Sequence, residues 1–356
     1  MAHAAPAAGI GVTAVVNLEG LTMKDGELAP GAWGEGFVDR RHPHTYLHEL
    51  MVTGTRRIGA ARLSIAAGKG FAPFGTDDPM SRPALRYPVN HHLAQILERL
   101  VAIVAVEAGP VGAEFGLFNG DEPERPGQWP NVSRFADSWA ARLTVRPFAG
   151  IEVQGSHAAV HSPEHRGGQG TAQRKWSVSA RAERTVAGLP LYFLGEWART
   201  TEGNGTFRFS SLLAEGAWRG RRERLYYRFE RTERPEEQRE LDFFRSIRPH
   251  LDNSIVGETR WTLHTVGAAY LVPLAAGRVR LEPLAEFTWA RPTSLTPAGF
   301  DAEAFYGNDR VWSVTVGARV SLGTTMHRMG RYGAAAEGGA ATHTEHSEPR
   351  DPEQHR

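Results

Sequence analysis

Histidine is the residue type in this chain that most directly suggests chemistry, because imidazole nitrogens bind transition metals and exchange protons near neutral pH. His42, His44 and His48 are spaced by two and four residues, and His91 is followed directly by His92. Side chains two residues apart on a strand share a face, so part of this group could converge on zinc or nickel. No compact ligand motif surrounds them, and we therefore expect polar residues at a wet loop rim, with no metal and no other cofactor.

Nucleophilic and phosphate-binding chemistry have weaker signals. The chain has no cysteine, which excludes thiolate sites and disulfides. It also lacks a Gly-x-Ser-x-Gly motif, and Ser156 and Ser162 stand next to histidines whose side chains would point to the opposite face of a strand. Gly68-Lys69-Gly70 lacks the spacing of a phosphate-binding loop. We therefore expect that the protein is not an enzyme.

Arginine and glutamate are the charged residues best suited to a binding or selectivity role. Guanidinium groups hold anions through paired hydrogen bonds, and rings of them along a passage favour anions. Alternatively, arginines and glutamates on neighbouring strands neutralise one another and keep a hydrated wall rigid. The residues that we expect to line such a passage are Arg62, Arg142, Arg181, Arg208, Arg228, Arg260, Arg278, Arg280, Glu196 and Glu286.

The elements that would position these charges are β-strands. Apolar and polar residues alternate with a period of two from Ile10 to Leu322, and no helical period extends beyond a few turns. The pattern predicts an all-β chain of about fourteen strands, with about sixteen as the alternative count. No apolar run is long enough for a transmembrane helix.

Long and short connections alternate between the predicted strands. The long loops are predicted at residues 21–44, 69–93, 121–137, 162–174, 233–257 and 291–310. The tight turns are predicted at residues 57–59, 109–111, 147–149, 187–188, 219–221 and 273–276. Long loops on one side and short turns on the other are typical of an up-and-down antiparallel transmembrane β-barrel.

Each predicted strand separates an apolar face from a polar face, as in residues 138–146, 175–183, 278–289 and 312–322. A barrel of about fourteen strands encloses more space than side chains can fill, so the apolar face should point outward to lipid. Indoles typically form a girdle at the membrane interface. We expect six tryptophans at the long-loop rim of the apolar face: Trp139, Trp176, Trp197, Trp261, Trp289 and Trp312.

The segment from Gly68 to Leu93 is predicted to be a structured loop that folds into the barrel. Pro73 and Pro79 exclude a helix, and the apolar Phe71 and Phe74 need a wall to pack against. Such a loop would set the narrowest point of a channel. The charged residues that we expect at this constriction are Lys69, Asp77, Asp78, Arg82 and Arg86.

Residues 60–121 carry a resemblance to a known family. Gly68-Lys69-Gly70-Phe71-Ala72-Pro73-Phe74-Gly75 is followed by Glu98-Arg99 and then by Gly116-Leu117-Phe118-Asn119-Gly120-Asp121. This order resembles the bacterial outer-membrane porins of the phosphate-selective O/P type. The resemblance implies a channel in the outer membrane of a Gram-negative cell and a homotrimer. The family's lysine ladder has no counterpart here, so phosphate specificity is not implied.

Composition and termini complete the predicted organisation. The formal net charge is +1, with 41 basic and 40 acidic residues, which argues against nucleic acid as a partner. The N-terminus lacks the basic and apolar regions of a secretory signal, and we expect a mature form or a misplaced start. We predict an N-terminal segment at residues 1–9, a barrel at 10–323, and a disordered C-terminal tail at 324–356 that is rich in Ala and Gly and then in His, Glu and Pro.

These observations together predict a passive outer-membrane channel for small hydrophilic solutes, with anions as one candidate class. Its expected partners are membrane lipid and the solutes themselves. Two alternatives stay open: an outer-membrane barrel with a metal-related or lipid-related binding or enzymatic role, and a structural barrel that is plugged by its own loops.

Overall fold

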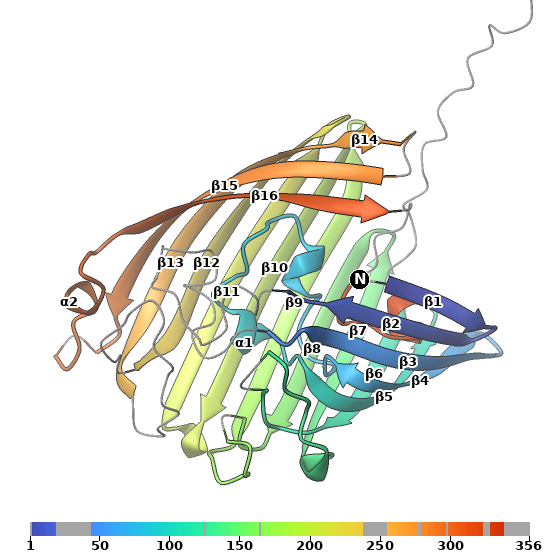
Figure 1. Cartoon of the computed structure of the whole chain (residues 1–356), viewed down its shortest axis with the longest axis horizontal. Coiled ribbons are helices and arrows are strands. Elements are labelled where there is room, and N and C mark those ends of the chain that lie inside the picture. Colours follow the sequence, from blue (N-terminus) through green and yellow to red (C-terminus); the bar gives the residue numbers. More distant parts are fainter. Residues whose placement is uncertain are drawn as a thin grey trace, which may run out of the picture.

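A single antiparallel sheet of sixteen strands curls around a common interior, which we call the lumen (Figure 1). The computed structural model describes residues 2–18, 44–123, 126–163, 165–237, 255–275, 279–296, 298–322 and 328–337. Within these ranges each strand pairs with its neighbours in sequence, from β1 to β13 and on to β15, which pairs with both β14 and β16. The predicted all-β, up-and-down architecture is confirmed.

The bounds of the elements follow the predicted pattern closely. The strands are β1 (Ala2–Ala7), β2 (Ile10–Val16), β3 (Leu47–Ile58), β4 (Ala61–Gly70), β5 (Arg99–Ala108), β6 (Val111–Phe118), β7 (Ser138–Phe148), β8 (Ile151–Val160), β9 (Gln173–Val186), β10 (Leu189–Glu202), β11 (Phe207–Arg219), β12 (Glu223–Glu237), β13 (Ile255–Tyr270), β14 (Val272–Leu274), β15 (Val279–Ser294) and β16 (Val311–Leu322). The helices are short: η3 (Pro79–Ser81), α1 (His91–Ala94), η4 (Val132–Arg134), η5 (Gly203–Gly205), α2 (Ala302–Tyr306) and α3 (Ala334–Glu337).

Two strands extend the sheet beyond the fourteen that the alternation predicts. β1 lies within residues 1–9, which we expected to be a separate segment, and it pairs with β2 from Ala2 opposite Ala14 to Ala7 opposite Ile10. In this alanine-rich stretch, polar and apolar residues do not alternate, so the sequence pattern does not predict a strand. Backbone hydrogen bonds between strands do not require such alternation, and β1 can therefore pair with β2. β14 follows β13 almost directly and pairs with the start of β15. The sheet therefore begins before residue 10.

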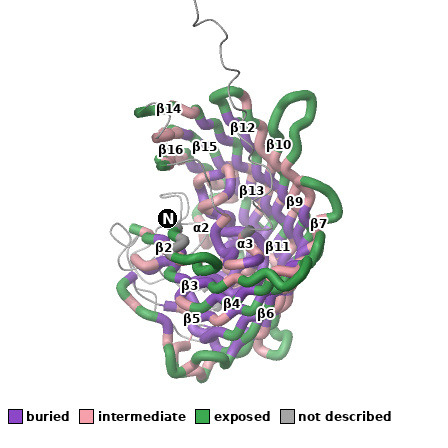
Figure 2. The backbone as a smooth tube through the Cα atoms, turned by 90° about the vertical axis from the view of Figure 1, so that its right-hand side faces the viewer, coloured by how far each residue is buried: buried purple, intermediate pink, exposed green. Residues whose placement is uncertain are grey.

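Buried and exposed residues alternate along the strands (Figure 2). In β16, Val314, Val316 and Val320 are 60%, 76% and 64% exposed. Ser313, on the lumen side of the same strand, is buried. The predicted apolar faces of β7, β9, β15 and β16 all point outward in this way. The sheet thus has an apolar outer surface and a polar inner one, the reverse of a soluble protein.

The face prediction is wrong for part of β11 and β13. Trp261 is fully buried and faces the lumen, while its neighbour Arg260 is outward and forms an ion pair with Glu233. Arg208 is exposed on the same face of β11 as the outward Leu212. In these strands apolar residues occur on both faces, because some of them pack against a loop inside the lumen, so alternation alone cannot mark the side. The other five predicted rim tryptophans face outward.

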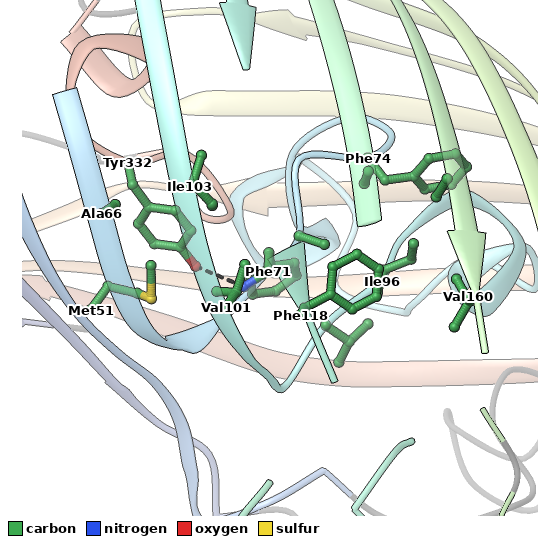
Figure 3. Packing of buried hydrophobic residues seen from close by; sticks show 14 residues of the cluster. Met51, Ala66, Phe71, Phe74, Ile96, Val101, Ile103, Phe118, Val160 and Tyr332 are labelled. Atoms are coloured by element: carbon green, nitrogen blue, oxygen red, sulfur yellow. Dashed lines mark hydrogen bonds between the residues drawn. The ribbon is translucent and has the colours of Figure 1, made fainter. Parts of the chain in front are cut away.

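The apolar core lies inside the lumen, between the inner wall and the segment of residues 71–98 that joins β4 to β5. We call this segment the lumen loop. Its Phe71, Phe74 and Ile96 pack with Phe118 and Val160 of the wall (Figure 3). The loop therefore folds inward, as predicted. Among the described residues no helix is long and apolar enough to cross a membrane.

A second segment also enters the lumen. Residues 328–337, which we call the C-terminal lumen segment, lie in the stretch that the sequence analysis assigned to a disordered tail. Met329, Tyr332 and Ala334 are buried there, and the Ala334 backbone N–H donates to Ser64 Oγ of β4 at 2.9 Å. The predicted boundary at residue 324 is therefore not the end of the ordered chain, because apolar and aromatic side chains fasten this part to the wall.

Candidate functional site

The lumen loop is held by carboxylates of the inner wall. The backbone N–H groups of Leu85 and Arg86 both donate to Glu286 of β15, and Val89 N–H donates to Glu230 of β12 at 2.6 Å. On the other side of the lumen, Gly75 N–H donates to Ser156 Oγ at 2.9 Å. A loop without regular secondary structure must satisfy its buried N–H groups somewhere, and here the wall supplies the acceptors.

Local sequence features shape the loop. Asp78 caps the short helix η3 by accepting from Met80 N–H at 2.7 Å, and Pro79 opens that helix. Gly75 has φ +70°, and a Cβ on it would lie 1.7 Å from the carbonyl oxygen of Ala94. Only glycine fits this close crossing of two loop strands. The glycine and proline residues noted in the sequence therefore shape the backbone of this loop.

The five residues that we expected at a constriction lie together in or beside this loop, but all are buried: Lys69, Asp77, Asp78, Arg82 and Arg86. The charged groups of Lys69 and Arg82 contact neighbouring side chains and backbone instead of facing an opening. Lys69 donates to Thr45 Oγ1, and Arg82 donates to Thr76 Oγ1 and to the Asp77 carbonyl and lies 3.6 Å from Glu196. This differs from the expected charged residues facing an opening, because the loop packs against the wall and its charged groups are buried there.

Most of the expected wall residues point into the lumen. Arg142 forms two hydrogen bonds with Glu114, at 2.6 and 2.7 Å, and Arg228 donates to Glu215 at 2.8 Å. The lumen-facing residues from the predicted set are Arg62, Arg142, Arg181, Arg228, Arg280, Glu196 and Glu286. Arg208 and Arg260 face outward, which corrects their assignment, and Arg278 lies outside the described residues. Pairing across strands, the alternative considered for these charges, is thus the prevailing arrangement in the described part of the wall.

A dense charge network surrounds Asp77. Two of its arginines, Arg328 and Arg331, were not predicted from the sequence as site residues. Arg181 of β9 donates to Asp77, which brings a residue predicted for the wall together with one predicted for the constriction. Arg328 and Arg331 of the C-terminal lumen segment also donate to the Asp77 carboxylate, at 2.5 to 3.1 Å. The signal that could have found them is the pair of arginines beside Tyr332, between the last strand and the Ala/Gly-rich stretch.

Electrostatics in this network favour the charged form of Asp77. Burial raises the pKa of the Asp77 carboxyl, but Arg328, Arg181 and Arg331 outweigh this effect and hold the pKa well below its usual range. A carboxylate buried among three guanidinium groups stays ionised at any physiological pH. The group can therefore act as a permanent anionic anchor.

Four of the five candidate histidines converge inside the lumen, and His42 lies outside the described residues. The ring of His44 lies 5.2 Å from that of His48 and 5.3 Å from that of His91, and His91 lies 5.3 Å from His92. His44, His48 and His91 are buried, so the expected wet rim is wrong for them. Among the residues that the structure describes, no three histidines or carboxylates are placed to hold a metal ion.

Glu98 ties this histidine group to the wall. It accepts from Thr45 N–H at 2.8 Å and Thr45 Oγ1 at 2.7 Å, and its Oε1 lies 2.8 Å from His48 Nδ1. Burial raises the pKa of Glu98, but the hydrogen bond and charge of His48, with His44 and Lys69, lower it to about 2. Glu98 belongs to the Glu-Arg pair of the resemblance, and its neighbour Arg99 donates to Glu122 at 2.6 Å. The pair is thus a structural clamp between loop and wall.

Comparison with known proteins gives only structural matches. No protein-family model and no curated protein matches the sequence. Among solved structures, OmpT, an outer membrane protein of Vibrio cholerae, matches with a TM-score of 0.45 and 10% identity over 90% of this chain and 89% of that chain. The anion-selective porin from Comamonas acidovorans matches with a TM-score of 0.40 and 10% identity over 76% of this chain and 87% of that chain.

A third match is OccK10 (OpdN) of Pseudomonas aeruginosa, with a TM-score of 0.38 and 12% identity over 78% of this chain and 84% of that chain. The TM-scores and the sequence identities of all three matches are low. What these proteins conduct or select is therefore not transferred to this chain, and the function has to be argued from the chain's own geometry.

Proposed function

We propose that the protein is an outer-membrane diffusion channel for small hydrophilic solutes. The observation that carries this proposal is the reversal of faces in the curved sheet, with valines, leucines and aromatics outside and ion-paired arginines and glutamates inside. An apolar outer band suits lipid, and a charged inner wall suits water and polar solutes. The five outward rim tryptophans support the same orientation in a bilayer.

The lumen loop supports a narrow passage over a wide one. It crosses from the β4–β5 side to Glu196, Glu230 and Glu286 on the opposite wall. The passage would then be set by the loop and its neighbours, including the predicted constriction residues. We place the protein in the outer membrane of a Gram-negative cell as part of this proposal.

Solute preference follows from the pairing of charges. Because the described inward arginines are largely matched by carboxylates, we propose a channel without strong charge selection, and anion preference is not part of the proposal. The chain has three lysines, Lys24, Lys69 and Lys175, and Lys69 is buried. The likeness to the phosphate-selective O/P porins therefore extends, in this proposal, to the barrel and its inward loop and not to phosphate.

A second candidate is a structural barrel plugged by its own segments. The specific observation in its favour is the burial of the loop charges and of the C-terminal lumen segment, which together fill part of the lumen. Planar-bilayer recordings separate the two candidates. We expect stepwise conductance from the purified protein, and larger steps after deletion of residues 74–86, because the wall strands pair without the loop.

Circular dichroism of the deletion variant is the control for folding. If the folded wild-type and deletion proteins both insert into the bilayer and neither conducts, the channel proposal fails and the plugged structural barrel stands.

A further inference from the structure

The C-terminal lumen segment makes several hydrogen bonds to the lumen loop and to the wall. Arg328 donates to Asp77 of the lumen loop and also to Glu152 of β8, at 2.7 and 3.1 Å. Met329 accepts through its carbonyl from Asp78 N–H at 3.2 Å. These bonds join a segment near the end of the sequence to residues that precede it by about half the chain or more.

Tyr332 forms a second anchor on the other side of the lumen loop. Its hydroxyl donates to Glu49 Oε2 of β3 at 2.5 Å and accepts from Phe71 N–H at 3.0 Å, as Figure 3 shows for the bond to Phe71. The same ring packs in the apolar cluster with Met51 and Ala66. Arg328 and Tyr332 therefore both bind the C-terminal lumen segment to the lumen loop and to the wall.

Two arginines share the same two carboxylates. Arg331 lies with its Nε 3.1 Å from Asp77 and its Nη2 3.4 Å from Glu152, beside the corresponding contacts of Arg328. The side chain of Arg331 is 1% exposed and that of Arg328 is 16% exposed. Planar guanidinium groups match carboxylates through paired N–H donors, which a lysine ammonium cannot reproduce.

Without the C-terminal lumen segment, the wall and the lumen loop together have one more negative than positive charge in this region. The connected ion pairs contain five carboxylates, those of Asp77, Glu107, Glu114, Glu152 and Glu183. The wall arginines in the same described network are four, namely Arg62, Arg142, Arg146 and Arg181. With Arg328 and Arg331 the described network has six arginines and five carboxylates, so these two residues more than offset the excess negative charge.

Arg328 also lines a small pocket at this position. The pocket is bordered by Thr76, Asp77, Arg82, Gln154, Ser179, Arg181, Leu194 and Arg328. Because Arg328 is the one contributor from the C-terminal lumen segment among these residues, withdrawal of the segment would widen the pocket and expose Asp77 and Glu152 to the lumen.

We propose that Asp77 and Glu152 form a guanidinium-binding site in the lumen, which the chain's own Arg328 and Arg331 occupy, so that residues 328–337 act as a plug that narrows the passage. When the plug is absent, the site takes free guanidinium-bearing solutes such as L-arginine. This inference rests on the channel proposed above, and it adds the segment that narrows the channel and the class of ligand that competes with it.

The test uses the full chain with both arginines replaced, R328Q/R331Q. The matched control is R56Q/R57Q, which removes the same charge from two exposed arginines of β3. In planar bilayers we expect the conductance step of R328Q/R331Q to exceed that of the wild type by about twofold or more, since a plug sets the narrowest point. The control should match the wild type.

Two additions test the site itself. A peptide with the sequence of residues 328–337 should reduce the conductance step of R328Q/R331Q to the smaller wild-type value, and the same peptide with both arginines replaced by glutamine should not. L-arginine should bind R328Q/R331Q in calorimetry in detergent, L-lysine should bind much more weakly, and the further substitutions D77N and E152Q should abolish arginine binding. The wild type, whose site is filled, should not bind arginine.

The outcomes separate the two proposals. If neither protein conducts but R328Q/R331Q binds arginine, the channel proposal fails and the guanidinium site stands. If both conduct with equal steps and R328Q/R331Q does not bind arginine, the plug and its site are overturned and the channel stands. If R328Q/R331Q does not fold by circular dichroism, a chain ending at residue 327 is the second variant, with the same expected conductance and arginine binding.

Discussion

At the scale of single residues, Glu98 shows how polar partners stabilise a buried charge in this protein. Glu98 accepts two hydrogen bonds from Thr45 and lies against His48, and these partners lower its pKa to about 2 although burial alone would raise it. A carboxyl whose pKa is lowered by folding stabilises the folded state above its ordinary pKa. That stabilisation is lost as the pH falls toward the lowered value.

We therefore predict that E98Q is less stable than the wild type at neutral pH and that the difference shrinks between pH 4.5, the ordinary value for this carboxyl, and pH 2. The change should be at most about 3 kcal/mol, the free energy of the full pKa difference. Urea titrations of both proteins in detergent at several pH values measure it. A difference that stays constant with pH would show that Glu98 is not ionised in the folded protein.

At the scale of elements, the lumen loop is a long irregular segment made rigid by close crossings and by acceptors on the wall. Its tightest point is Gly75, where a positive φ coincides with the nearby carbonyl of Ala94. Wall residues Ser156 and Glu286 then hold the loop on opposite sides. Strain at this crossing should therefore spread to the whole constriction.

We predict that G75A destabilises the protein by about 1–3 kcal/mol, because alanine at this φ and distance forces the loop to shift. Its conductance should also be more variable from channel to channel. G127A is the matched control, since Gly127 is exposed and has no heavy atom within 4 Å of an added Cβ. Equal unfolding curves and equal conductance for the two variants would contradict the role of the crossing.

At the scale of the whole molecule, the two faces of the sheet have different solvents. Val316 is 76% exposed on the outer face of β16, and its neighbour Thr315 lies on the inner face. In a bilayer, a charge on the outer face has to be taken into lipid, whereas a charge on the inner face meets water and other polar groups.

We predict that V316R lowers the stability of the membrane-inserted protein by about 2–4 kcal/mol if Val316 lies near the bilayer midplane. T315R, one residue away, should have a much smaller effect. Folding into lipid vesicles, followed by urea titration, measures both. If the two variants are equally stable, or if the protein stays a monodisperse soluble monomer without detergent, the proposed membrane orientation is wrong.

The sequence by itself determined fourteen of the sixteen described strands, the up-and-down order and the outward faces of most strands. These features depend on local properties: period-two alternation sets the face of a residue, and loop length sets the direction of the next strand. Residues such as Trp139, Trp176 and Val316 were therefore placed correctly without any knowledge of contacts. The inward course of the lumen loop was also predictable, because Phe71 and Phe74 need a wall.

Only the tertiary structure decided what fills the lumen. Trp261 turned inward because the apolar part of the lumen loop lies against β13, and the histidines became buried because the loop covers them. Arg328 and Arg331 contact Asp77, which precedes them by about 250 residues in the sequence. Residue spacing does not predict contacts between segments that are this far apart. Charge pairing inside the curved wall depends on which segments share the lumen, and that is a property of the folded chain alone.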